Sequence, residues 1–321
     1  MRYFFLFIVL FIVLKAYIKL AKLYNIVDHP NSRSSHSKIT VRGGGIIFPV
    51  GAITWFIFSG FQFPIFFLGL ILISTISFLD DIKQLSPKIR LTFQLVAISL
   101  LLSELGFWQF DWWLWIIVLI IATGTINAFN FMDGINGITG GYSLAVVVCL
   151  WMVNTFQVEF ISNEFIFFIA ISVLVFCLFN FRKKAICFAG DVGAISIAFI
   201  LIFLLVKLII QTKNPLYLLF IGIYGVDSII TILYRIWHKE NIFEAHRKHI
   251  YQLMANELKI PHIPIAAIYS ILQLLICLIV FFIIKAFTWS VGLYLGLGTL
   301  GILILLFYVT RLNINKKLNK Q

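Results

Sequence analysis

The feature that most constrains this chain is a series of eleven long apolar runs that carry almost no charge. A transmembrane helix needs about 20 such residues. Hydrophobic residues make up 61% of the 321 residues, charged residues only 12%, and the mean hydropathy of +1.03 excludes a soluble globular protein. The runs are 3–20, 44–59, 63–79, 91–105, 112–126, 141–156, 165–181, 194–210, 216–234, 265–285 and 289–308.

The continuous apolarity of these runs predicts helices. In hydrocarbon, a segment must satisfy its own backbone hydrogen bonds, whereas the strands of a membrane barrel would alternate in polarity at every second residue. We therefore expect an all-α, polytopic membrane protein with about eleven transmembrane helices. Residues 1–321 would form a single integral membrane domain, since the loops are too short for a separate soluble one.

Charge predicts the orientation. With the N-terminus in the periplasm and the C-terminus in the cytoplasm, 20 cationic residues lie inside and four outside, as the positive-inside rule requires. The net charge of +12 reflects this bias, so it gives no reason to expect nucleic acid as a partner. The expected cytoplasmic loops are 21–43, 80–90, 127–140, 182–193 and 235–264.

The first candidate functional cluster is a pair of acidic residues at the end of the third run. Asp80 and Asp81 are followed by Lys88 and Arg90. The acids could hold a divalent cation or take a proton, and the bases could hold phosphate oxygens. An equally good interpretation is a solvated helix end, because adjacent helical residues point about 100° apart and need not share a site.

The second cluster is a loop rich in Asn and Gly with no Lys or Arg. Asn127, Asn130 and Asp133 recur every third residue, which places them roughly along one face of a helical or 3₁₀ turn, and Asn136 continues the series. The glycines of the loop allow a ligand to approach the backbone closely. The alternative is an ordinary tight turn.

A third signal is Asp191, which lies between Gly190 and Gly193 at the start of a long apolar run. Its carboxylate is predicted either to cap the following helix or to bind a metal ion.

The fourth signal is the group His246, Arg247, Lys248 and His249 in the longest cytoplasmic loop. Imidazole and guanidinium groups suit a diphosphate. The alternative is a basic loop that lies on lipid headgroups, which we favour for Lys248.

Taken together, these motifs resemble the polyprenyl-phosphate N-acetylhexosamine-1-phosphate transferases, the superfamily of the phospho-MurNAc-pentapeptide translocase and the O-antigen initiators. The resemblance also includes 28–36 and the Arg42–Gly45 segment, and it spans about 225 residues in the order of the family. The loop around His246 is more similar to the O-antigen initiators.

The resemblance implies Mg²⁺-dependent transfer of a sugar 1-phosphate from a UDP-N-acetylamino sugar to undecaprenyl or another polyprenyl phosphate, with release of UMP. It also implies a bacterial inner membrane location, a cytoplasmic active site and a lipid groove. A homodimer is a further expectation. Which amino sugar is transferred is left open by the motifs.

Residue roles follow from the same resemblance. Asp191 would bind Mg²⁺, with Asn130 as a second ligand or a substrate contact. Asp80 and Asp81 would bind or deprotonate the lipid phosphate, and Asp133 would line the nucleotide-sugar cleft. The two anions must meet in line, so positioning matters more than a strong base. A lipid phosphate is largely dianionic at neutral pH, and unaided attack and Asp-assisted attack both stay open.

The resemblance also implies roles for the cationic loop and for Asn136. His246, Arg247 and His249 would meet the diphosphate or the sugar, with His246 placed among the catalytic residues. Many bacterial members carry Asp where this chain has Asn136. Asn binds Mg²⁺ more weakly than a carboxylate does, so we expect Asn136 to contact the nucleotide.

A transporter or lipid flippase is the alternative function. It predicts paired half-repeats and charges near the middle of the spans. Apart from Lys19, Glu104 and Lys285 at the very ends of their runs, Lys15, Lys207 and Asp227 are the charges within the runs, and we take all of them to lie toward the ends. Of these, Asp227 is the least explained by the sequence. A purely structural scaffold would leave the clustering of acids without a reason.

Overall fold

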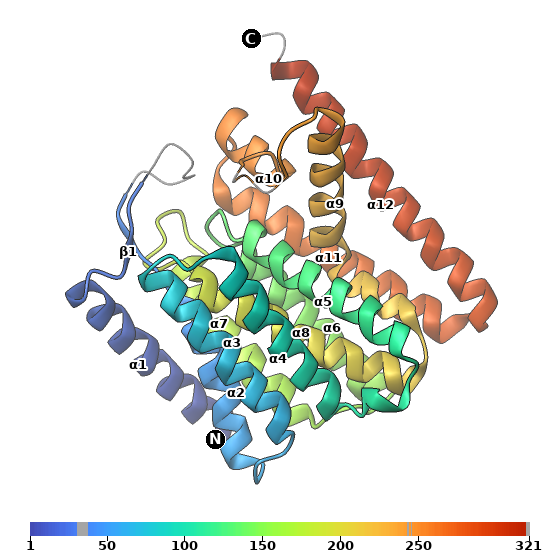
Figure 1. The fold of residues 1–321 in the computed structure, drawn as a ribbon, viewed down its shortest axis with the longest axis horizontal. Helices are drawn as coiled ribbons and strands as arrows, with labels where there is room; N and C mark the ends of the chain where they lie inside the picture. Colours follow the sequence, from blue (N-terminus) through green and yellow to red (C-terminus); the bar gives the residue numbers. More distant parts are fainter. Residues whose placement is uncertain (31–37, 243, 245, 319–321) are drawn as a thin grey trace.

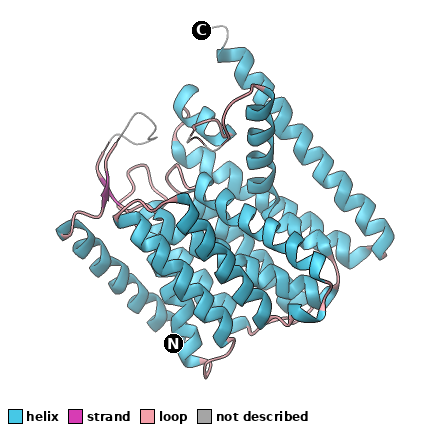
Figure 2. Ribbon diagram, in the orientation of Figure 1, coloured by secondary structure: helices cyan, strands magenta, loops and turns pink. Residues whose placement is uncertain are grey.

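The computed structural model describes residues 1–30, 38–242, 244 and 246–318. The described chain is almost entirely helical (Figures 1 and 2). The first half contains α1 (Arg2–Leu23), α2 (Ile47–Phe58), α3 (Pro64–Ile82), α4 (Pro87–Glu104), α5 (Trp112–Met132) and α6 (Ile138–Phe156). The second half contains α7 (Asn163–Asn180), α8 (Gly190–Thr212), α9 (Gly222–Trp237), α10 (Ile250–Gln252), α11 (His262–Ala286) and α12 (Trp289–Leu318).

Short elements connect these helices. Three are 3₁₀ helices, η1 (Gly44–Ile46), η2 (Phe107–Gln109) and η3 (Pro215–Ile221), and η4 (Leu253–Glu257) is a π-helix. Strands β1 (Val27–Asp28) and β2 (Thr40–Val41) pair in antiparallel fashion, with Val27 opposite Val41. The part of the resemblance at 31–36 lies outside the described residues.

All eleven expected runs fall on helices, but the number of membrane crossings is not confirmed. Within the described residues, nine helices are long and apolar enough to span a membrane, counting η3 and α9 as one. The helix Gly44–Phe58 is shorter. The segment α4 is helical but is not among the nine, and its first residues include Lys88 and Arg90.

Several polar segments expected to be loops belong to helices. Asp80 and Asp81 lie in the last turn of α3, Arg90 lies in α4, and Asn130 lies in α5. Helical backbone hydrogen bonding does not end where the apolar run ends, because charged side chains at a helix terminus can extend toward water. The helices therefore deliver these side chains directly to the end of the bundle.

The central helix of the bundle is α8, which is buried along most of its length. It packs against α2, α3 and α5, as expected for a helix that is apolar on every face. A close approach between two backbones fixes its start: a Cβ atom on Gly45 would lie 2.3 Å from the Cα atom of Gly193. Only glycine fits this contact, which holds η1 against the beginning of α8.

The connections that carry the candidate motifs gather at the end of the bundle opposite the N-terminus (Figure 1). Val41 forms a bridge to Cys187, and the amide of Gly44 donates a hydrogen bond to the carbonyl of Phe188 at 2.8 Å. Tyr251 donates a hydrogen bond from its hydroxyl to the carbonyl of Phe131 at 2.7 Å. All five segments predicted to share one side of the membrane therefore meet at one end of the fold.

Candidate active site

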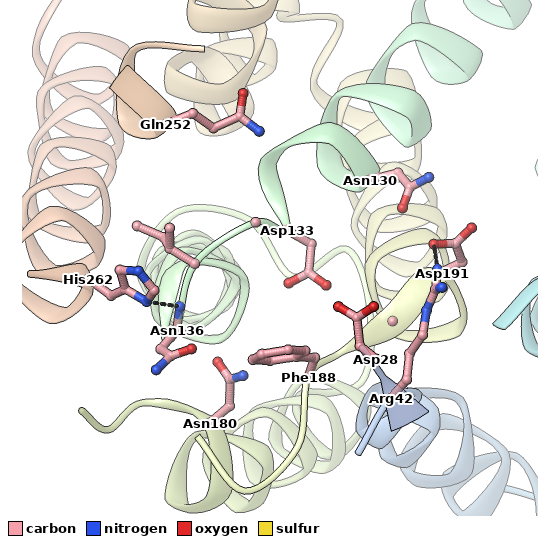
Figure 3. Close-up of a pocket in the computed structure, with 13 residues that line it drawn as sticks. Asp28, Arg42, Asn130, Asp133, Asn136, Asn180, Phe188, Asp191, Gln252 and His262 are labelled. Atoms are coloured by element: carbon pink, nitrogen blue, oxygen red, sulfur yellow. Dashed lines mark hydrogen bonds and ion pairs between the residues drawn. The ribbon is translucent and has the colours of Figure 1, made fainter. Parts of the chain in front are cut away.

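A polar cavity of about 280 Å³ opens where these segments meet (Figure 3). Its lining combines carboxylates, carboxamides, one guanidinium, one phenyl ring and one imidazole. The lining residues are Asp28, Arg42, Asn130, Asp133, Gly134, Ile135, Asn136, Asn180, Phe188, Gly190, Asp191, Gln252 and His262.

Asp81 organises the start of α8. Its Oδ1 atom accepts a hydrogen bond from the amide of Asp191 at 2.8 Å, and its Oδ2 atom accepts one from the amide of Val192 at 3.0 Å. Gly190 has φ +72°, and a Cβ there would lie 2.6 Å from Asp81. A buried carboxylate thus satisfies the unpaired amides at the positive end of the helix dipole. The Asp81 side chain is 0% exposed, so proton transfer to it would require these contacts to break.

Because Asp81 caps the start of α8, the carboxylate of Asp191 is free to pair with two arginines. Its Oδ1 atom lies 2.9 Å from Nη2 of Arg42, and its Oδ2 atom lies 3.7 Å from Nη1 of Arg90. Between the two sequence-based alternatives for Asp191, the structure therefore favours a carboxylate that faces the cavity over a helix cap.

Two arginines tie the three carboxylates into one cluster. Arg42 also pairs with Asp81, with 2.6 Å between Nε and Oδ1, while Arg90 pairs with Asp80, with 3.2 Å between Nη1 and Oδ2. Adjacent acids at the end of α3 thus meet different arginines yet converge on Asp191. Lys88, expected beside them, is exposed on α4 and does not line the cavity.

Asn136 joins two loops of the site. Its side-chain amide donates hydrogen bonds to the carbonyls of Arg182 at 3.1 Å and Lys183 at 3.2 Å. Its backbone amide donates to Nδ1 of His262 at 3.4 Å. A carboxylate could not donate to those two carbonyls. This gives a physical reason for Asn, and not Asp, at this position.

Asp133 lies at the end of α5 and points into the cavity (Figure 3). The hydroxyl of Thr139 donates a hydrogen bond to its Oδ1 atom at 2.6 Å. Burial raises the pKa of Asp133 to about 6, although the bond from Thr139 opposes that shift. The carboxyl is therefore held closer to neutrality than an ordinary aspartate.

The site fits a magnesium ion that shares its coordination with substrate. Within the described part of the chain, no group of three His, Cys, Asp or Glu side chains could hold a metal by itself. Mg²⁺ usually takes one or two carboxylates and completes its shell with water and substrate phosphates. Asp191 and Asn130 line the same cavity, with Asn130 just above Asp191 in Figure 3, and both offer the hard oxygen donors that such a partial set requires.

The cationic loop lies beside this cavity and only partly in it. His249 is 2% exposed, with Nδ1 3.7 Å from Oδ1 of Asp227, and it is not among the described residues that line either the polar cavity or the cavity next to it. The His246 ring packs near Phe131 and His249, and it is not among the described residues that line the polar cavity. Burial and the neighbouring positive groups lower the pKa of His246 to about 4, which keeps it neutral.

Arg247 lines a second cavity of about 730 Å³ that adjoins the first through Asn136, Phe188 and His262. Cations dominate this second cavity. Its remaining charged residues are Lys38, Lys183, Lys184, Glu257 and Lys259. Such a lining favours anions that approach the polar cavity.

Two apolar cavities adjoin along α5 and share Ile121, Thr125, Leu218 and Ile221. The first lies between α5, α8 and η3, and the second lies between α5, η3 and α9. The second of them reaches Ala128 and Phe129, the residues just before Asn130. An almost entirely hydrocarbon-lined groove therefore ends close to the polar cavity.

Several lining residues were not selected from the sequence as site residues. Asp28 and Arg42 fall in segments that contributed to the resemblance. Arg42 also directly precedes the glycine run that packs on α8, and these two facts could have identified both residues from the sequence. Asn180, Phe188 and His262 had no such signal, because single residues at helix ends reveal their partners only in the fold. Figure 3 places the Phe188 ring between Asn180 and Asp28.

Comparison with known proteins finds relatives of one kind. Residues 63–209 match the model of Glycosyl transferase family 4. The undecaprenyl-phosphate alpha-N-acetylglucosaminyl 1-phosphate transferase of Escherichia coli (strain K12) is 29% identical over 260 residues, covering 74% of this chain and 71% of the relative. The probable undecaprenyl-phosphate N-acetylglucosaminyl 1-phosphate transferase of Bacillus subtilis (strain 168) is 26% identical over 256 residues, covering 71% and 70%.

Proposed function

Because the chain belongs to the polyprenyl-phosphate N-acetylhexosamine-1-phosphate transferase superfamily and is thus a phosphotransferase, we propose that it transfers an N-acetylamino-sugar 1-phosphate from a UDP-sugar to undecaprenyl phosphate. UMP would be the second product. The observation that carries this proposal is the cluster of Asp80, Asp81 and Asp191 with two arginines, which reaches the polar cavity through Asp191 and Arg42. N-acetylglucosamine is the first sugar to test, since the relatives' names contain it.

The acceptor lipid has a path to this site. A polyprenyl chain is a flexible hydrocarbon, and the groove formed by the two adjoining apolar cavities, which ends between α5 and α9, offers it an apolar lining. At the inner end of the groove, Ala128 and Phe129 lead to Asn130 in the polar cavity. A chain in the groove would therefore place its phosphate beside Arg90 and Arg42, whose guanidinium groups suit phosphate oxygens.

The donor would occupy the polar cavity. An aromatic ring is a suitable stacking surface for a nucleobase, and Phe188 supplies one. Asn180 lies beside that ring, and carboxamides can pair with the edge of uracil. The diphosphate would then reach toward Arg42 and Asp191. In this arrangement, the cations of the second cavity raise the local concentration of the anionic donor.

Catalysis would depend mainly on positioning. Asp191 and Asn130 would hold Mg²⁺, which supplies positive charge for the diphosphate when it is bound. Arg42 and Arg90 fix the carboxylates before substrate arrives and can shift toward phosphate oxygens when it binds. Asp81, with its two oxygens occupied by amides of α8, acts as a positioning residue in this scheme, which leaves the dianionic lipid phosphate to attack unaided.

We place the reaction at the cytoplasmic face of a bacterial inner membrane. The sequence has sixteen cations in the expected interior loops and four in the C-terminal tail, against four on the other side, and this bias supports that side. Transfer there would start the assembly of an O-antigen or related surface polysaccharide on its lipid carrier.

The proposal is tested with membranes that contain the protein, undecaprenyl phosphate and a panel of UDP-sugars, with and without Mg²⁺. We expect lipid-dependent release of UMP with at least one UDP-N-acetylamino sugar. Release of UDP instead of UMP, or no release with any donor while the protein is folded and inserted, would contradict the proposed reaction.

A further inference from the structure

Helix α9 carries two buried charges, Asp227 and Arg235, that the proposed reaction does not use directly. Asp227 is 0% exposed and Arg235 is 3% exposed. Taking a charge out of water costs several kcal/mol. Apolar side chains would pack α9 against its neighbours without that cost, so the two charges call for a specific explanation.

Arg235 holds the first part of the segment that follows α9. Its Nη1 atom donates to the carbonyl of Ile242 at 3.1 Å, and its Nη2 atom donates to the carbonyls of Asn241 and Glu244, the latter at 3.1 Å. Its Nε atom lies 3.2 Å from Oε2 of Glu240, which also pairs with Lys248. One guanidinium thus binds three backbone carbonyls and one carboxylate of a single loop.

Asp227 holds the other end of the same loop. Its Oδ1 atom accepts a hydrogen bond from the amide of Ile250 at 3.1 Å and lies 3.7 Å from Nδ1 of His249. On the opposite side, Tyr269 of α11 donates to its Oδ2 atom at 2.7 Å. This anchors the point at which the loop enters α10.

The residues between and just beyond these anchors face the two cavities. Arg247 lines the basic cavity, and Gln252 lines the polar one. The side chain of Gln252 accepts a hydrogen bond from the amide of His249 at 3.2 Å, which links it to the Asp227 anchor. The position of both lining residues therefore depends on how the loop is held at its two ends.

We propose that Arg235 and Asp227 are positioning residues that clamp the 240–250 loop so that Arg247 and Gln252 meet the nucleotide-sugar donor. This inference rests on the proposed function for the identity of the donor, but the clamp itself is a property of the fold. The clamp acts on the donor side, so it should leave the lipid groove between α5 and α9 unaffected.

Two conservative variants test the clamp. In Arg235→Lys, one ammonium cannot reach three carbonyls and Glu240 together. In Asp227→Asn, one of the two acceptor oxygens is replaced by a donor. The matched controls are Arg2→Lys and Asp111→Asn, which change the same residue types at exposed positions remote from the loop.

Two readouts are measured on the full-length protein in detergent or membranes. We expect faster hydrogen exchange in peptides covering 240–256 and unchanged exchange in α3 and α8. The KM for the UDP-sugar should rise about tenfold, as expected when hydrogen bonds to one charged group are lost, with the KM for undecaprenyl phosphate unchanged. Neither control should move either quantity.

Hydrogen exchange tests the clamp independently of the proposed reaction, because the measurement needs no substrate. If wild type releases no UMP while the variants still loosen 240–256 selectively, the reaction is wrong and the clamp stands. Unchanged exchange in 240–256 would overturn the clamp. A uniform increase in exchange across the bundle, with kcat and both KM values altered together, would also overturn it, since that pattern marks a general stability role.

Discussion

The carboxylate of Asp81 accepts a hydrogen bond from the backbone amide of Asp191 at 2.8 Å. The end of α3 therefore fixes the first turn of α8, and Asp191, which we propose as a Mg²⁺ ligand, is oriented by a second acid that is itself 0% exposed. Asp81 thus stabilises the start of α8 inside the protein, whereas Asp191 faces the cavity.

Asp81→Asn should destabilise the protein as well as reduce its activity. The change removes the charge that faces Arg42 and one of two acceptors for the amides of α8. Breaking a buried ion pair costs about 3–5 kcal/mol. We expect a clear fall in the thermal unfolding temperature in detergent, with little change in the exposed control Asp111→Asn. An Asp81→Asn protein of wild-type stability but no activity would instead identify Asp81 as a general base.

Asp191→Ala should abolish Mg²⁺-dependent UMP release without preventing insertion. The backbone amide that Asp81 caps is retained in this variant, so the start of α8 should persist. Loss of a group that stabilises charge in the transition state reduces rates about 100- to 1,000-fold. The assay uses membranes with undecaprenyl phosphate, with the amount of inserted protein measured in parallel. Full activity would remove Asp191 from the metal site.

Asn136→Asp should weaken donor binding. The new carboxylate would face the carbonyls of Arg182 and Lys183 without a proton to donate. We expect the KM for the UDP-sugar to rise about tenfold, or ~1.4 kcal/mol. Asn214→Asp is the matched control, because Asn214 accepts a hydrogen bond from the amide of Leu216 and a carboxylate can do the same. Unchanged kinetics in Asn136→Asp would show that the loop contact is dispensable.

The sequence predicts the helical membrane architecture well, because apolar runs report directly on burial in lipid. It also brings Asp80, Asp191 and Asn130 to one end, since helix direction and charge bias determine which ends meet. It could not assign Asp81 to the start of α8, because adjacent acids are equivalent until their partners are placed. Asp227, unexplained by the sequence, finds its partners in Tyr269 and Ile250, which lie on segments remote in the chain.

Gly225→Trp should block the lipid without disturbing the fold. Gly225 lines the apolar groove, and a Cβ atom there meets no other atom within 4 Å. An indole would fill space proposed for the polyprenyl chain. We expect the KM for undecaprenyl phosphate to rise about tenfold and the KM for the donor to stay constant. Gly298→Trp on α12, where a Cβ is equally free, is the control. Equal effects of both substitutions would exclude a specific lipid site in the groove.

The Asp133→Asn variant should be more stable than the wild type at neutral pH, and this difference should disappear at acidic pH. Burial raises the pKa of Asp133 from 3.8 to about 6, so ionising it in the folded protein costs free energy. Its stabilising contribution is complete below pH 3.8 and is lost as the pH rises through 6. Above pH 6, the neutral carboxamide should therefore be more stable than the carboxylate, by at most about 3 kcal/mol.

This gain should shrink as the pH falls toward 4, where the wild-type carboxyl is itself protonated. The carboxamide of the variant can still accept the hydrogen bond from Thr139, so the loop geometry should persist. The measurement is thermal unfolding from pH 4 to 8 in a chelator, with the exposed Asp111→Asn variant as control, and UMP release assayed on the same preparations. A stability difference that does not change with pH would show that Asp133 titrates alike in the folded and unfolded protein, which would contradict a pKa raised by burial.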